Sequence, residues 1–147
     1  MKDMEERPKV GVGVILAKEN KVLLLKRKHS HGEGTWGFPG GHLEFNEEIE
    51  DCVQREVYEE TGIKVSNIRF ASLTNDLFKK ENKHYITIFM LCDWESEEAQ
   101  IKEPERCAAQ AWFEWKKLPT PLFLPITNLL KQGYHPFGSF NTKRKTL

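Results

Sequence analysis

The stretch from Gly41 to Ile63 reads GHLEFNEEIEDCVQREVYEETGI and contains a clear helical pattern. Its apolar residues recur at helical spacing and form one face, which consists of Ile49, Cys52, Val53 and Val57. Asn46 is of a residue type that caps the start of a helix, and Gly62 is of the type that ends one. We therefore predict an amphipathic helix over residues 47–61. Its polar face is expected to carry Glu50, Asp51, Gln54, Tyr58 and Thr61.

The last turns of this helix depart from the ordinary amphipathic pattern. Glu56 and Glu60 continue the apolar face, and Glu59 lies beside them. Three neighbouring carboxylates repel one another, and acids near a helix C-terminus oppose its dipole. Arg55 points to a different side of the helical wheel. A divalent cation would compensate this charge, since Mg²⁺ takes oxygen ligands from carboxylates and substrate phosphates. The alternative is an acidic surface patch without a role.

The residues ahead of the helix favour the metal site. Residues 32–42 read GEGTWGFPGGH, a glycine-rich loop of the kind that lets the backbone approach a ligand closely. Glu44 and Glu47 add acids at the helix entrance. Arg27 ends the preceding strand and is placed to meet a phosphate from the other side. Its neighbours Lys26 and Lys28 are interpreted as a solvated strand end.

The rest of the chain predicts a sheet and a second helix. Apolar alternation indicates strands over residues 10–16, 22–25, 64–75, 84–93 and 111–115, with a hairpin turn at 79–83 and a helix over 125–132. Gly11 and Gly13 leave one strand face nearly bare, which indicates close approach of a ligand or tight packing. We predict an α/β sandwich, formed by a single domain over residues 1–147 with flexible ends at about 1–8 and 138–147.

The composition excludes several classes of function. Lysine plus arginine and aspartate plus glutamate number 22 each, a balance that argues against a nucleic-acid partner. The polar N-terminus does not resemble a secretory signal, and no apolar run is long enough to cross a bilayer. The three cysteines show no metal-site spacing and predict reduced thiols in a cytoplasmic protein.

The quoted stretch resembles the Nudix box, G-x5-E-x7-R-E-U-x-E-E-x-G-U, in which U is a bulky apolar residue. Gly41, Glu47 and the run REVYEETGI from Arg55 match every fixed position. The resemblance implies a Nudix-type α/β/α sandwich with a mixed central sheet. It also implies a hydrolase of nucleoside diphosphates linked to a further group, which uses Mg²⁺ or, as a substitute, Mn²⁺.

The same resemblance assigns roles to the matching residues. Glu56, Glu59 and Glu60 correspond to the acids that ligate the metal, together with Gly40. Arg55 corresponds to the arginine that pairs with and orients the acids, and Glu47 to the first box glutamate. Gly41 lets the loop turn tightly, and Gly62 ends the helix.

The group that accepts the proton of the attacking water varies in this family. Glu56 or Glu59 is the candidate inside the box. Glu103 or Glu105, in the loop before the last strand, is the candidate outside it. For Glu103 and Glu105 a solvent-exposed loop acid without a role is the alternative.

Shorter strings narrow the resemblance to one branch. GVGV, GFPGGHLEF, KENKHYITI and QGYHPF are similar to the small MutT-like nucleoside triphosphate diphosphatases, a branch that includes the human thiopurine nucleotide diphosphatase. This likeness implies hydrolysis of nucleoside triphosphates, including oxidised or modified ones, to monophosphate and pyrophosphate, and it implies a homodimer. Residues 121–125, PLFLP, differ from the human enzyme beside the base pocket, so the preferred base stays open.

A flat base requires an apolar slot with a stacking partner. We expect this slot from Phe38, His42, Thr87 and Phe123, with Arg27 and Gly41 contacting the rest of the substrate. Core packing is the alternative for Phe38 and Phe123, and a loop histidine without a ligand is the alternative for His42.

Two further hypotheses compete with the triphosphate. One keeps the chemistry but takes dihydroneopterin triphosphate, a dinucleoside polyphosphate or a nucleotide sugar. ADP-ribose is less expected, because its pyrophosphatases often carry an extra N-terminal subdomain. The other hypothesis is a catalytically silent module that only binds a nucleotide or a protein. Such modules usually lose box acids, and this chain keeps all of them.

Overall fold

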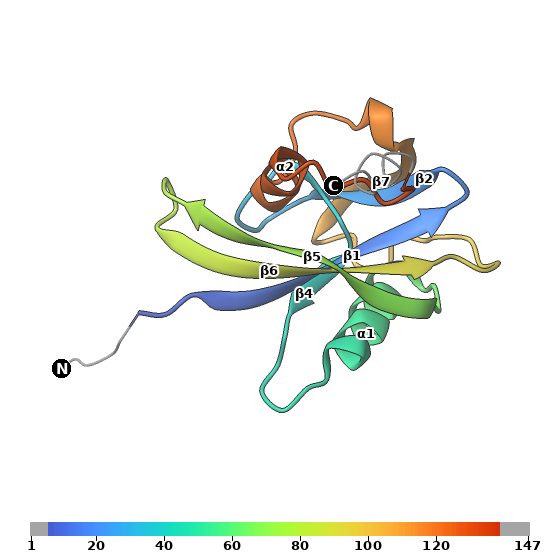
Figure 1. The fold of residues 1–147 in the computed structure, drawn as a ribbon, viewed down its shortest axis with the longest axis horizontal. Helices are drawn as coiled ribbons and strands as arrows, with labels where there is room; N and C mark the ends of the chain where they lie inside the picture. Colours follow the sequence, from blue (N-terminus) through green and yellow to red (C-terminus); the bar gives the residue numbers. More distant parts are fainter. Residues whose placement is uncertain (1–5, 139–147) are drawn as a thin grey trace, which may run out of the picture.

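The computed structural model describes residues 6–138 and confirms the predicted α/β sandwich. A mixed sheet lies between α1 (Ile49–Thr61) and α2 (Leu124–Lys131), which cover opposite faces (Figure 1). The strands are β1 (Lys9–Lys18), β2 (Lys21–Arg27), β3 (Trp36–Gly37), β4 (Gly40–His42), β5 (Ser66–Phe78), β6 (Lys83–Asp93) and β7 (Cys107–Glu114). The flexible ends predicted from the sequence lie mostly outside the described residues. No helix within residues 6–138 combines the length and the apolar character that a membrane span requires.

The sheet runs in the order β3-β2-β1-β6-β5, with β4 also paired to β1 and β7 to β2. Only the β1–β6 pair is parallel among these pairings, which makes the sheet mixed. The predicted β5–β6 hairpin is confirmed. The sequence predicts a loop over the glycine-rich residues 32–42, but part of this segment forms the short strands β3 and β4. The strand β4 pairs with residues Gly11 to Gly13 of β1, because glycines on both strands allow close approach.

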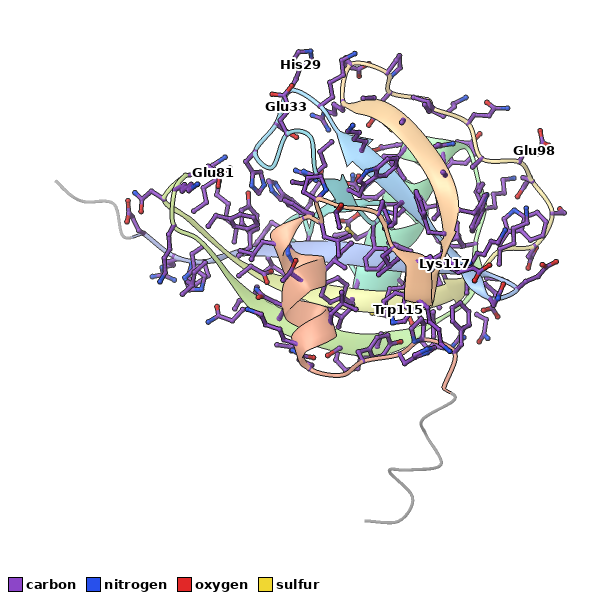
Figure 2. The ribbon with its side chains drawn as sticks, turned by 90° about the horizontal axis from the view of Figure 1, so that it is seen from above. His29, Glu33, Glu81, Glu98, Trp115 and Lys117 are labelled. Atoms are coloured by element: carbon purple, nitrogen blue, oxygen red, sulfur yellow. The ribbon has the colours of Figure 1, made fainter. Side chains whose placement is uncertain are left out.

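The two faces of β1 carry different layers of the core. Val12, Val14 and Leu16 pack with Val53 and Val57 of α1. Ile15, on the other face, packs with Leu129 of α2 and with Trp115. Figure 2 looks down on α2 lying across the strands, with Trp115 to one side of the helix, by the end of β7. Trp115 begins a short 3-10 helix (Trp115–Lys117) and does not end the last strand as predicted.

Three details of α1 differ from the prediction. The helix begins at Ile49, and Asn46 is not its cap but has a positive φ of 67°. The Glu47 carboxylate instead accepts the Glu44 N–H at 3.0 Å, and this turn delays the helix. Thr61 is fully buried, and its hydroxyl is satisfied there because Oγ1 donates to the Val57 carbonyl and accepts from the Ile63 N–H. Gly62, with φ 78°, ends the helix as predicted.

Candidate active site

The acidic end of α1 lines a cavity of about 590 Å³. Glu56, Glu59 and Glu60 lie on its wall, together with Glu103 from the loop before β7. Basic side chains complete the lining, and these are Lys9, Arg27, Arg55, Lys83 and Arg106. A cavity with acids and bases on its wall suits a ligand that carries phosphates together with a cation.

Glu60 is hydrogen-bonded to the backbone of the glycine-rich segment. Its Oε1 accepts the Gly40 N–H at 3.0 Å. Burial raises the pKa of Glu60 well above its ordinary value, and the nearby carboxylates of Glu56 and Glu103 raise it further. Burial also raises the pKa of Glu56, against the opposing effect of Arg55. Glu59 is more open, with 48% of its side chain exposed.

Arg55 does not point away from the acids, as the helical wheel had predicted. Its guanidinium curls back and donates to both oxygens of Glu47, at 2.8 and 3.0 Å, and to Glu56 Oε2 at 3.0 Å. A carboxylate oxygen of Glu59 lies 3.6 Å away. This pairing lowers the pKa of Glu47 to about 2 and raises the pKa of Arg55. The long side chain reaches what its Cα position on the wheel does not.

The residues present fit a divalent cation. Within residues 6–138 no group of three or more His, Cys, Asp or Glu side chains is arranged as a ready metal cage. The carboxylates of Glu56 and Glu60 are nevertheless close together, and the pKa of each is raised by burial. A Cβ on Gly41 would lie 2.2 Å from Glu56 Oε2, so only glycine permits this approach of backbone to carboxylate. Oxygen donors of this kind suit Mg²⁺ or Mn²⁺.

A smaller pocket of about 110 Å³ adjoins the acidic cavity. All four residues predicted for the base slot line it, namely Phe38, His42, Thr87 and Phe123. Arg27, Gly40 and Gly41 line both spaces, so the two are continuous. The Arg27 guanidinium lies 3.9 Å from the Phe123 ring centroid, between pocket and cavity. Phe38 also stacks on Trp115, so it belongs to the core and to the pocket.

Sequence reasoning missed several lining residues. His31 and Tyr85 stack with ring centroids 5.3 Å apart, and Phe78 packs edge-on against both. Arg106 lines the cavity, as does Glu103, whereas Glu105 is exposed and outside the lining. These side chains come from loops and a hairpin that meet only in the fold. The KENKHYITI string was a signal for Tyr85, but no pattern in the sequence pointed to His31.

His31, on the wall of this pocket, makes the stability of the folded protein depend on pH. Burial, followed by the charge of Arg27, lowers its pKa from 6.5 to about 4. Between pH 6.5 and 4 the unfolded chain therefore binds a proton that the folded protein does not, and falling pH favours unfolding. We expect the Tm to fall across this window, and His31→Phe to remove part of the fall. Thermal denaturation followed by circular dichroism measures it. The exposed His29→Phe is the control, and identical pH profiles for wild type and His31→Phe would refute the expectation.

These features define the class of the protein. An α/β sandwich with glutamates at a helix end, over a cavity lined by acidic and basic side chains, is the architecture of a hydrolase that acts on pyrophosphate bonds. The family model described as "NUDIX domain" matches residues 7–132. The chain belongs to the Nudix family.

Individual relatives agree with this assignment. ADP-ribose pyrophosphatase of Methanocaldococcus jannaschii is 33% identical over 118 residues, which cover 79% of this chain and 68% of that protein. NAD-capped RNA hydrolase NudC of Vibrio parahaemolyticus is 38% identical over 106 residues, which cover 72% of this chain but 38% of that protein. The crystal structure of a MutT NUDIX hydrolase from Burkholderia pseudomallei superposes with a TM-score of 0.79 at 30% identity, covering 88% of this chain and 98% of that one.

Proposed function

We propose that the protein is a Mg²⁺-dependent nucleoside triphosphate pyrophosphohydrolase, which converts a triphosphate to monophosphate and pyrophosphate. The observation that supports this proposal is that the aromatic pocket and the acidic cavity are continuous. The aromatic pocket would take the base, and Arg27 and the acids of α1 lie where the attached phosphates would follow. We further propose a cytoplasmic location, which the free thiols of the three buried cysteines favour.

The acidic and the basic residues would have different roles in the reaction. Glu56, Glu59 and Glu60, with Gly40, would hold the metal, which when bound withdraws charge from phosphorus and neutralises the leaving group. Arg27 would bind a phosphate across the cavity, and Arg55 keeps Glu56 in place through its 3.0 Å hydrogen bond. A glutamate would take the proton of the water that attacks in line. Glu56, Glu59 and Glu103 all line the cavity, whereas the exposed position of Glu105 makes it the weakest candidate.

A second candidate substrate is a nucleoside diphosphate linked to a sugar or a second nucleoside. The names of the relatives above favour it, since they act on ADP-ribose and on NAD-capped RNA. Dihydroneopterin triphosphate and dinucleoside polyphosphates would use the same acids. A silent binding module is the least favoured, because Glu47, Arg55 and the three acids at the end of α1 are all present.

Product analysis distinguishes these substrates. The protein is incubated with a panel of NTPs, dNTPs, oxidised dNTPs, ADP-ribose, NADH and dinucleoside polyphosphates, with Mg²⁺ or Mn²⁺, in ¹⁸O-labelled water. We expect monophosphate and pyrophosphate from triphosphates, with the label showing which phosphorus was attacked. Hydrolysis of ADP-ribose or NADH alone would favour the second candidate, and no turnover of any compound with either metal would refute the enzyme.

A homodimer is the proposed assembly, and the edge of the sheet supports it. Leu73 and Leu77 lie on one face of β5 and are 50% and 47% exposed. The half-exposed Ile86 and Ile88 of β6 lie beside them in the ladder. An unpaired edge strand with apolar side chains is a typical place for association.

Substitution of an edge residue tests this assembly. Leu73→Asp is expected to convert a dimer to a monomer in light scattering coupled to gel filtration, because it places a charge in the apolar interface. Ile101→Asp, at an exposed loop position, is the matched control. A wild-type protein that elutes as a monomer at high concentration would contradict the proposal.

A further inference from the structure

Asp76 is a buried carboxylate behind the aromatic pocket. It lies on β5, is fully buried, and does not line the pocket or the cavity. Three donors surround it. Its Oδ2 accepts from Thr87 Oγ1 at 2.5 Å and from Thr74 Oγ1 at 3.1 Å, and its Oδ1 accepts from Asn128 Nδ2 at 2.8 Å. The network thus joins β5, β6 and α2 just outside the pocket.

This network determines what the Thr87 hydroxyl offers to a ligand. A hydroxyl has one proton and two lone pairs, and a carboxylate only accepts. Thr87 lines the pocket, and its short hydrogen bond to Asp76 uses its only proton. The oxygen therefore presents lone pairs to the pocket. The negative charge of Asp76 behind it further favours a positive partner.

The glycines of β1 keep this acceptor accessible. Gly11 lies opposite Thr87 in the parallel ladder, and a Cβ on Gly11 would lie 3.8 Å from Thr87 Oγ1. A Cβ on Gly13 would lie 3.6 Å from the Thr87 methyl group and 3.1 Å from the Phe89 ring. Both glycines also line the pocket. Side chains at these two positions would crowd Thr87, so their absence favours the approach of a planar ring edge to its hydroxyl.

We propose that Asp76 is a specificity-determining positioning residue. By holding Thr87 as an acceptor, it makes the pocket select heterocycles that carry an N–H donor on the inserted edge over those that carry only acceptors there. The inference rests on the proposed nucleotide substrate and adds the polarity of its base. A role in attaching α2 alone does not require a carboxylate at this place. Gln132 already joins α2 to β5 through Ser72 Oγ at 2.6 Å and the Leu73 carbonyl at 2.8 Å.

Binding of monophosphates tests the proposal without hydrolysis. Two pairs of ligands differ by one amino group, AMP against purine riboside 5′-monophosphate and GMP against IMP. Titration calorimetry of the wild type is expected to show, in at least one pair, about threefold to tenfold tighter binding of the amino compound, the worth of one hydrogen bond. Thr87→Val is expected to abolish this ratio, and Thr87→Ser, which keeps the hydroxyl, to retain it.

The neighbouring positions separate positioning from packing. Asp76→Asn is expected to shrink the ratio, because an amide can donate to Thr87 and leave its proton for the ligand. Thr74→Val removes another donor to Asp76 but lies outside the pocket lining, so the ratio should persist. Should Asp76→Asn fail to fold by circular dichroism, the Thr87→Val and Thr87→Ser pair still tests whether the Thr87 hydroxyl is the acceptor, on which the role of Asp76 depends.

Each failure has a distinct signature. Equal ratios in wild type and Thr87→Val, or no preference in either ligand pair, would overturn the role of Asp76 even if triphosphates are hydrolysed. Absence of triphosphate turnover, with the amino preference intact, would instead refute the proposed function and leave the pocket polarity standing. A protein that binds none of the four monophosphates would overturn the inference as well.

Discussion

Glu60→Gln is expected to lower kcat/KM for triphosphate hydrolysis by about 10²- to 10⁴-fold while the fold persists. Glutamine has nearly the same shape, and its Oε1 can still accept the Gly40 N–H that Glu60 accepts at 3.0 Å. The substitution removes a charge whose burial is unfavourable, as the raised pKa of Glu60 indicates, so stability should not suffer. The loss should therefore fall on metal binding and catalysis alone.

Two measurements confirm the origin of this loss. Titration with Mn²⁺ should show weaker binding to Glu60→Gln than to wild type. Glu50→Gln, an exposed position in the first turn of the same helix, removes the same charge away from the cavity and should retain wild-type kinetics. Retention of activity by Glu60→Gln to within about threefold would contradict the assignment of the acidic end of α1 as the metal site.

Gly40→Ala is expected to cost at least about 3 kcal/mol of unfolding free energy, or to prevent folding. Its φ of 152° disfavours any side chain, and an added Cβ would lie 1.9 Å from the Val12 carbonyl oxygen. This contact is with backbone inside the β1–β4 ladder, so no rotamer change relieves it. Urea denaturation of the two proteins measures the difference.

Gly34→Ala is the matched control for Gly40→Ala. Gly34 also has a positive φ, of 86°, but nothing lies within 4 Å of an added Cβ. Only backbone strain remains there, and the expected cost is about 1 kcal/mol. Equal losses at the two positions would show that strain, and not the clash with Val12, sets the cost.

Regular spacing made much of the molecule predictable. The acids of α1 recur at helical intervals, so their common placement followed from the period alone. The alternation of β1 likewise predicted its two faces. The direction of the Arg55 side chain was predicted wrongly, because a helical wheel locates Cα atoms and not the end of a long side chain. Thr61 was assigned to the polar face because the residues that bury it, 100–102, come from far along the chain. They pack over the helix end, where the Gln100 N–H donates to the Thr61 carbonyl.

Residues without a local pattern could not be placed. His31 lies in an irregular loop, and only the stacking on Tyr85 of the distant β5–β6 hairpin brings it to the pocket. The Asp76 network could not be predicted for the same reason, because Thr74 and Asp76 appear in the sequence as ordinary polar residues near the end of a strand. Their burial depends on α2, which contributes Asn128 from the other end of the chain.

The parallel pairing of β1 with β6 has a consequence for biosynthesis. Lys9 pairs with Tyr85, and Ala17 with Asp93, so the centre of the sheet joins the earliest strand to one made much later. A nascent chain that has not emerged past Asp93 holds β1 without its main neighbour and exposes the apolar residues that await α1 and α2. Such distant pairing slows folding and leaves a growing polypeptide open to aggregation. Ribosome-associated chaperones are therefore expected to engage this protein during translation, between the emergence of β2 and that of β6.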